Sequence, residues 1–319
     1  MHDFKYLQLV SGKAKMKAFF DALDAVRSEA LRPVAIAFAS NIERLKNMAV
    51  SPAEIAQQAR RDASWVFYAE YLVTGKIRKP FSEEAQLSSD EVIEKFQALL
   101  EEFISRLTDN DRSYLVEKLG VDFVDAMLKD TPGMEKGMEA FLSSMVIGYW
   151  AAFEALAPDL WKSAINNGPV ELSTRINLAT QDKPDSKIAK HWGDNLQGDI
   201  RKDYGGGLIE GGRVSFRTLD RIIQWYAVTF KDEGRRIFKD NPDIYAVAAY
   251  RNAFVHNSGR VDRDFIKQIE PIDNLRGKFK VNDALELDGE IVNRLRDAIC
   301  STGLHLIQLA DDLMSPKSP

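Results

Sequence analysis

Apolar residues recur along most of this chain at the three- and four-residue intervals that are typical of amphipathic helices. The segment 88–107 carries them at Val92, Phe96, Leu99, Leu100, Phe103 and Leu107. The segment 286–313 repeats the pattern at Leu287, Ile291, Leu295, Ile299, Leu306 and Leu309. No stretch of useful length alternates apolar and polar residues as a strand does. The pattern therefore predicts an all-α protein.

Helix boundaries follow from the residues between these runs. Ser51, Pro52 and Glu54 have the spacing of a capping box, which predicts a helix over 51–75. A long helix is expected over 136–166, with Pro158 kinking it or ending its first segment. A weaker helix is expected over 186–204, and "GGGLIEGG" at 205–212 is expected to be a flexible loop. Ser215 is expected to cap the next helix.

The strongest break in the middle of the chain is "KDTPGMEKG" at 129–137. We therefore divide the chain into an N-terminal helical domain, 1–130, and a helical domain, 131–319. A four-helix bundle is the natural packing for the second domain.

Composition narrows the function classes. The 319 residues carry a net charge of −5, which argues against a general nucleic-acid coat but leaves room for a local basic groove. The one cysteine, Cys300, excludes an intrachain disulfide and makes a cysteine-based metal site unexpected. No membrane span and no secretory signal are expected, so a cytoplasmic protein is predicted.

The stretch "AAYRNAFVHNSGRVDRDF", 248–265, combines polar residues that can act together. Arg251 and His256 lie roughly 140° apart around an ideal helix, whereas Asn252 and His256 share a face. The break at 257–259 lets the imidazole swing, and a long arginine can reach around the helix. The three side chains can therefore converge on one cleft. Alternatively, Arg251 pairs with a core carboxylate and His256 is a cation at the helix C-terminus.

The segment "RNAFVHNSGRVD" resembles the signature of the HEPN superfamily, in which an arginine and a polar residue precede a histidine by a few positions. "GYWAAFEALAPDLWKSAI" is similar to the aromatic-rich first helix of prokaryotic HEPN domains. The resemblance covers roughly 131–315 and implies a HEPN-like four-helix bundle. It says nothing about the first 130 residues.

The resemblance also implies an activity. Many HEPN proteins are metal-independent ribonucleases whose two motifs meet across a homodimer. In this chain His256 would transfer protons, Arg251 would stabilise the pentacoordinate phosphate and Asn252 would position them. Histidine titrates near neutral pH and arginine offers a fork of donors to phosphoryl oxygens, so the residue types suit the chemistry. No metal and no cofactor is expected.

Three further residues are candidates for supporting roles. Glu154, in an apolar helix, is expected to pair with Arg251 or to form an ion pair that serves the fold alone. Arg260 and Arg263 are expected either to contact RNA phosphates or to be solvated loop residues. The other histidines, at positions 2, 191 and 305, have no partners at metal-ligand spacing.

Three interpretations remain open. The first is an endoribonuclease, a toxin or antiviral-defence effector that cleaves tRNA or another structured RNA, with residues 1–130 sensing a signal or binding an antitoxin or other partner. The second is a non-catalytic HEPN module for dimerisation, interaction or nucleotide binding. The third is a helical scaffold outside this superfamily, in which Arg251 and His256 would face different ways.

Overall fold

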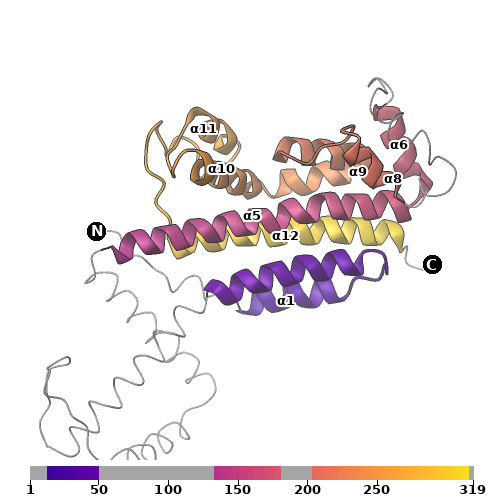
Figure 1. The fold of residues 1–319 in the computed structure, drawn as a ribbon, viewed down its shortest axis with the longest axis horizontal. Helices are drawn as coiled ribbons and strands as arrows, with labels where there is room; N and C mark the ends of the chain where they lie inside the picture. The colour runs from indigo at the N-terminus through magenta and orange to yellow at the C-terminus, as the bar shows by residue number, and fades with distance from the viewer. Residues whose placement is uncertain (1–12, 50–132, 181–202, 316–319) are drawn as a thin grey trace, which may run out of the picture. The chain divides into compact units, whose positions relative to one another are not determined.

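The computed structural model describes residues 13–49, 133–180 and 203–315. Apart from an isolated bridge between Arg260 and Ala284, these residues form no strand. The expected all-α class is confirmed for these ranges. Their helices are α1 (Lys13–Asp24), a helix over 32–49, α5 (Met134–Asn167), α6 (Val170–Thr180), α8 (Tyr204–Glu210), α9 (Leu219–Asp240), α10 (Asp243–His256), α11 (Arg263–Ile269) and α12 (Gly289–Met314) (Figure 1).

Some expected helices cannot be compared with the structure. The helices predicted over 51–75 and 88–107 lie outside the described residues, as does most of the one predicted over 186–204. Histidines 2 and 191 lie outside them as well.

The chain divides into two compact units, one of residues 12–46 and 139–319 and one of residues 1–11 and 47–138. This division differs from the boundary expected near residue 130, because α1 and most of the helix over 32–49 belong with the C-terminal part. The Ser163 hydroxyl of α5 donates a hydrogen bond of 2.9 Å to the Ala30 carbonyl. The Asp311 carboxylate of α12 accepts one of 2.7 Å from the Ser28 amide. Long-range contacts of this kind leave no local signal in the sequence.

The helices α5 and α12 lie side by side in the middle of the larger unit (Figure 1). The pair α1 and 32–49 covers one side of them, and α9 and α10 cover the other. The core between these layers is rich in aromatic side chains. Five aromatics of α5 and α9, which recur in the sequence at helical spacing, are buried in it: Trp150, Phe153, Trp161, Trp225 and Tyr226.

Two buried polar side chains of this core are paired with each other's helices, as burial requires. The Trp161 indole donates 2.7 Å to the Thr229 hydroxyl, and the Tyr226 hydroxyl donates 2.9 Å to the Ala157 carbonyl. Both bonds join α9 to α5, so they fix the helices in register. The helix α9 is then interrupted at Lys231, whose φ of 57° is not helical.

Several local expectations differ from the structure. The long helix expected over 136–166 is present as α5, but Pro158 lies inside it and does not end a first segment, since α5 continues to Asn167. Thr218, rather than Ser215, caps α9, accepting from the Arg221 amide at 3.4 Å. The last helix begins at Gly289 behind an Asp288 cap.

The glycine-rich segment expected to be a loop forms the short helix α8 instead. Asp203 caps it by accepting 3.0 Å from the Gly206 amide, and Asn166 of α5 accepts 2.7 Å from the Gly205 amide. A Cβ on Gly205 would lie 3.1 Å from the Lys162 Cα. Glycine is therefore used here for close packing against α5 rather than for flexibility.

One described helix, Lys136–Asn167, is long and apolar enough to cross a membrane, with a mean hydropathy of 1.4 in its most apolar window. Half of that window is buried inside the structure. Core helices of water-soluble proteins have the same length and composition, so this helix is weak evidence for a membrane span.

Candidate functional site

The helix α10 holds the arginine, asparagine and histidine of the motif. Its buried face includes Ile244, Val247, Tyr250 and Ala253, which pack against neighbouring helices. At its first turn, Asp243 accepts 2.8 Å from Nε of Arg294 on α12. This ion pair and the buried face fix the rotation of α10 about its axis.

That rotation places the three motif residues at the surface end of the helix. Arg251 and Asn252 are half-buried, and His256, the last residue of α10, is exposed. The Arg251 guanidinium donates 3.0 Å from Nη1 to the Asn252 side-chain oxygen. The same Nη1 lies 3.4 Å from Nε2 of His256. The structure therefore brings all three predicted residues together.

This convergence decides between two expectations. An ideal helix would separate Arg251 and His256 by roughly 140°. The long arginine side chain and the position of His256 in the last turn close that gap, as we expected from the break at 257–259. A scaffold with Arg251 and His256 facing different ways is therefore the wrong description of this end of α10.

Arg251 has no ion pair with a carboxylate among the described residues. Glu154, the expected partner, is half-buried on α5 and forms no salt bridge within the described ranges. The expected pairing is therefore wrong for this structure. On α5 it is Phe153 and Ala157 that face the core, which leaves Glu154 at the flank of the packed face.

The residues after His256 build a tight turn. The amides of Asn257 and Gly259 both donate to the Ala253 carbonyl, at 2.9 and 3.0 Å. Gly259 has a φ of 73°, in the left-handed region that glycine adopts without strain. The Asn257 side chain donates to the Asp262 carboxylate, which also accepts 2.7 Å from the Phe265 amide and so caps α11. These motif residues therefore shape the turn that positions His256.

Arg260 and Arg263 are both exposed. Arg260 donates 3.1 Å from Nη1 to the Asn282 carbonyl, so it ties the turn to the loop before α12. Arg263 opens α11. Neither forms a hydrogen bond with Arg251 or His256 among the described residues.

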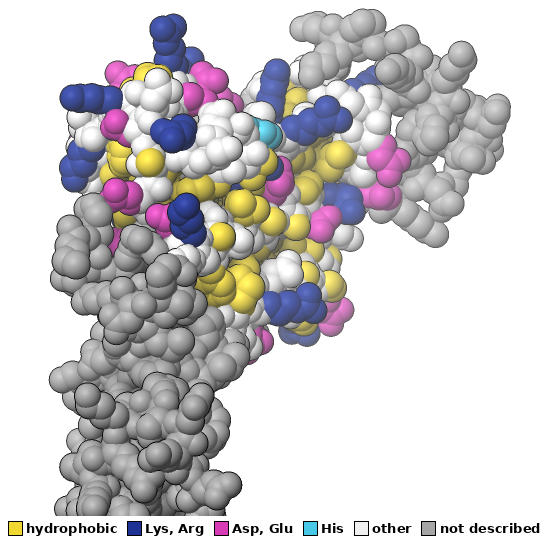
Figure 2. Space-filling model, turned by 60° about the vertical axis from the view of Figure 1, so that its left-hand side comes forward, with side chains coloured by type: hydrophobic (Ala, Val, Ile, Leu, Met, Phe, Trp, Pro, Cys, Tyr) yellow, Lys and Arg dark blue, Asp and Glu magenta, His cyan; other side chains and the backbone are white. Residues whose placement is uncertain are grey.

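Positive and negative side chains are mixed on the surface around α10 and α11. On the face that Figure 2 shows, Lys and Arg side chains are interspersed with Asp and Glu, and a histidine lies at the surface. The apolar side chain of Val255, next to His256, is 45% exposed. A substrate that binds here would meet local positive groups rather than a continuous basic surface.

The buried hydroxyl of Tyr250 and the buried thiol of Cys300 do not ionise at neutral pH. Burial raises the pKa of the Tyr250 hydroxyl to about 12, and burial raises that of the Cys300 thiol to about 12. A thiol of this kind is not a nucleophile. In the described ranges, no group of three or more His, Cys, Asp or Glu side chains is arranged to hold a metal ion.

The arrangement has the components of acid–base chemistry on an anion. An imidazole can accept or donate a proton, and a guanidinium can stabilise negative charge on oxygen. The Asn252 oxygen accepts from Arg251 and so orients the guanidinium. Because a guanidinium only donates, its contact with His256 is attractive when Nε2 is the unprotonated nitrogen of the ring.

Sequence reasoning did not single out the loop between α11 and α12. Its segment "RGKFKVND", 276–283, places Phe279 between Lys278 and Lys280, and it packs beside Tyr250. An aromatic residue between two lysines in a loop was the signal that could have marked it.

The chain matches no protein-family model, no curated protein and no solved structure. An assignment of function therefore depends on the motif and on the geometry of α10.

Proposed function

We propose that this protein is a metal-independent endoribonuclease whose catalytic residues are Arg251, Asn252 and His256. The observation that carries the proposal is the convergence of the guanidinium and the imidazole, 3.4 Å apart, at an exposed helix end. Arg251 has no carboxylate partner among the described residues, so its charge is free to act on a phosphate.

The reaction is a transesterification. The 2′-oxygen of one nucleotide attacks the adjacent phosphorus, its proton passes to a base, and the bond to the 5′-oxygen breaks as that oxygen receives a proton. The products are a 2′,3′-cyclic phosphate and a 5′-hydroxyl. Arg251 stabilises the charge on the phosphoryl oxygens, and Asn252 holds Arg251 in place.

The two proton transfers favour a site made by two chains. Each chain supplies one motif histidine, whereas the reaction needs a base on one side of the phosphorus and an acid on the other. A homodimer in which two α10 ends meet would supply both. The exposed side chain of Val255, adjacent to His256, suits such a contact.

The same proposal includes the fold family and the biological role. The motif and the aromatic-rich α5 support a HEPN-like helical bundle, and this resemblance suggests a cytoplasmic toxin or antiviral-defence effector. On this proposal the unit of residues 1–11 and 47–138 contributes a sensor or a site for an antitoxin. The proposal assigns no catalytic role to Glu154.

The test is cleavage of total RNA by the purified protein in EDTA. The His256→Ala variant should lose about 10²–10⁴-fold in rate, the usual contribution of general acid–base catalysis. His305, which is exposed on α12, provides a matched control. His305→Ala should cleave like the parent, and a His256→Ala variant that retains activity would refute the assignment.

Two observations favour a second function. The mixed charge of the surface in Figure 2 and the exposed Val255 suit a protein contact as well as an RNA contact. A non-catalytic dimerisation module would show no RNA cleavage by any variant, and Val255→Asp would dissociate its dimer.

A further inference from the structure

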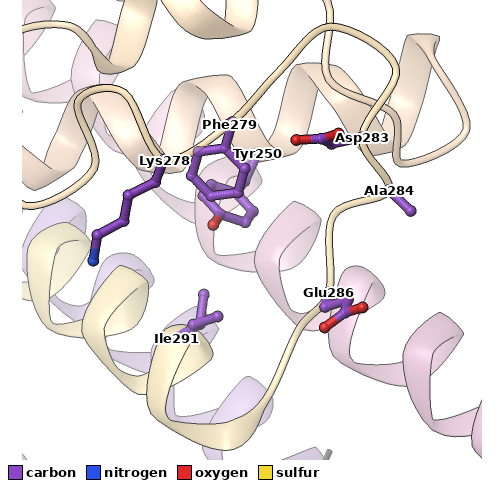
Figure 3. Close-up of a pocket in the computed structure, with 7 residues that line it drawn as sticks. All are labelled: Tyr250, Lys278, Phe279, Asp283, Ala284, Glu286 and Ile291. Carbon is purple, nitrogen blue, oxygen red and sulfur yellow. The ribbon is translucent and has the colours of Figure 1, made fainter.

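An open cleft lies beside Tyr250, the residue before Arg251. Its volume is about 440 Å³, within the range of about 300–1,000 Å³ that is common for small-molecule sites. It is lined by α10, by the loop before α12 and by the start of α12. The lining residues that Figure 3 labels are Tyr250, Lys278, Phe279, Asp283, Ala284, Glu286 and Ile291.

Backbone hydrogen bonds join this cleft to the turn that follows His256. The Val261 amide donates 2.9 Å to the Asp283 carbonyl, and the Leu285 amide donates 2.8 Å to the Gly259 carbonyl. The Arg260 side chain adds its bond to Asn282. The loop that forms one wall of the cleft is therefore fixed to the motif.

The aromatic wall of the cleft is suited to stacking. The Phe279 ring is half-exposed, and an edge-on contact with Phe265, 5.3 Å between centroids, holds it in place. Phe265 in turn packs 5.4 Å from Tyr250. A flat ligand that stacks on Phe279 would therefore meet a ring that is already ordered.

The polar groups define what such a ligand carries. In Figure 3 the two aromatic side chains stand between Lys278 on one side and Asp283 on the other. One Asp283 carboxylate oxygen, Oδ2, accepts 2.7 Å from the Lys280 amide. The other oxygen, Oδ1, has no hydrogen bond among the described residues and can accept one. Lys278 is exposed and can meet a phosphate.

We infer that the cleft is a subsite for one unpaired nucleobase with an exocyclic amino group, next to the phosphate that is cut. The base stacks on Phe279, its amino group donates to Asp283, and its phosphate lies near Lys278. Adenine, cytosine and guanine have such a group, whereas uracil has none. The inference deepens the proposed function and depends on it for the role of the bound nucleotide in cleavage.

Binding of the four nucleoside 5′-monophosphates to the parent tests the subsite without any cleavage step. AMP, CMP and GMP should bind roughly tenfold tighter than UMP. Phe279→Ala should weaken all four by about tenfold, because stacking of a base on an aromatic ring is strong and tolerant of sequence. Phe20→Ala, which removes a half-buried aromatic from α1, is the matched control and should change nothing.

Asp283→Asn gives the sharpest result. The asparagine oxygen can still accept from the Lys280 amide, but its NH₂ replaces the open acceptor with a donor. The preference should therefore move toward UMP, whose ring carbonyls accept. Equal binding of all four nucleotides by the parent, or an unchanged preference in Asp283→Asn, would overturn the inference.

Further measurements separate the possible failures. If Phe279→Ala unfolds at a lower temperature than the parent, nucleotide binding is measured instead on Phe279→Leu and on Lys278→Ala, which changes an exposed residue. Unchanged nucleotide affinity in both variants would overturn the subsite. The parent should bind a single-stranded pentaribonucleotide at least as tightly as the best monophosphate, and exclusion of the longer strand would make the cleft a free-nucleotide site. Cleavage of RNA without any dependence on Phe279 would overturn the subsite and leave the proposed function intact. Nucleotide binding without RNA cleavage would support the subsite and count against the proposed ribonuclease function.

Discussion

Arg27 and Arg251 each lie next to a titratable side chain, and their surroundings are opposite. Arg27, in the turn between α1 and the helix over 32–49, donates 3.0 Å from Nε to Asp311 and also pairs with Asp312. Arg251 donates to a neutral asparagine and lies beside a histidine. The charge of Arg27 is neutralised by two carboxylates, whereas Arg251 has no carboxylate partner in the part of the chain that the structure describes.

The side chains next to the two arginines, Asp311 and His256, also differ in burial and in hydrogen bonding. Asp311 is 6% exposed and accepts from the amides of Arg27 and Ser28 as well as from the Arg27 side chain. His256 is exposed at the end of its helix. A buried and fully bonded carboxylate stabilises a structure, while an exposed imidazole beside an unneutralised guanidinium is available to a substrate.

The largest expected effect is on Arg251. Arg251→Ala should lower the rate of RNA cleavage by about 10²–10³-fold, as is usual when a group that stabilises transition-state charge is removed. The melting temperature should change little, because Arg251 makes no ion pair within the described ranges. Arg236→Ala, which removes an exposed arginine of α9, serves as the control in the same assay. Loss of stability without loss of rate would make Arg251 a structural residue like Arg27.

Asp311→Ala should lower the stability of the protein and leave the rate of RNA cleavage unchanged. It leaves the amides of Arg27 and Ser28 without their acceptor, which should cost about 2 kcal/mol of unfolding free energy in a denaturant titration. Cleavage at a temperature well below unfolding should be unaffected. Asp312→Ala, which removes an exposed carboxylate, should cost less than about 0.5 kcal/mol. Equal costs for the two variants would show that Asp311 is not the buried acceptor described above.

Asp311 also predicts a pH dependence. Burial by itself would raise the pKa of this carboxyl, but the hydrogen bonds from the Ser28 amide and from Arg27 lower it below its ordinary value. A lowered pKa in the folded state means that the stabilisation is complete above the unfolded pKa of about 3.9 and is lost as the pH falls through the folded value. The difference in melting temperature between the parent and Asp311→Ala should thus be constant near neutral pH and shrink below about pH 4. A difference that shrinks between pH 7 and 5 would contradict this assignment.

The smallest effect is expected at the arginines beyond the turn. Arg263→Ala should weaken RNA binding a few-fold and reduce the slope of log affinity against log salt by about 0.7, the value for one phosphate contact on a single strand. Binding is measured in the His256→Ala background so that the RNA stays intact. Arg260→Ala should do less, since its side chain is bonded to Asn282. An unchanged salt slope for Arg263→Ala would mean that this residue is only a solvated helix start.

The sequence was informative where the determinants are local. The Asn-Ser-Gly segment at 257–259 ends α10 where the structure has it. The position of His256 at that boundary is what allowed its approach to Arg251 to be anticipated. The five core aromatics were also predictable, because they recur at helical spacing.

The errors arose where distant contacts decide the structure. Glycines at 205–207 favour a loop by intrinsic propensity, but Asn166 and the surface of α5 stabilise a helix there. Residues 12–46 belong with α12 because of Asp311, which is far away in the sequence. The wall of the cleft around Phe279 likewise depends on pairing between the turn at 259–261 and the loop at 283–285.

The most direct test of the central claim is the chemistry of the RNA ends that the protein produces in EDTA. The parent should leave a 2′,3′-cyclic phosphate and a 5′-hydroxyl, and it should spare a substrate with a single 2′-deoxynucleotide at the cut site. The His256→Ala protein should leave the intact substrate uncut. Products with a 3′-hydroxyl and a 5′-phosphate, or cleavage that persists at the 2′-deoxy position, would contradict attack by the 2′-oxygen and the role assigned to Arg251, Asn252 and His256.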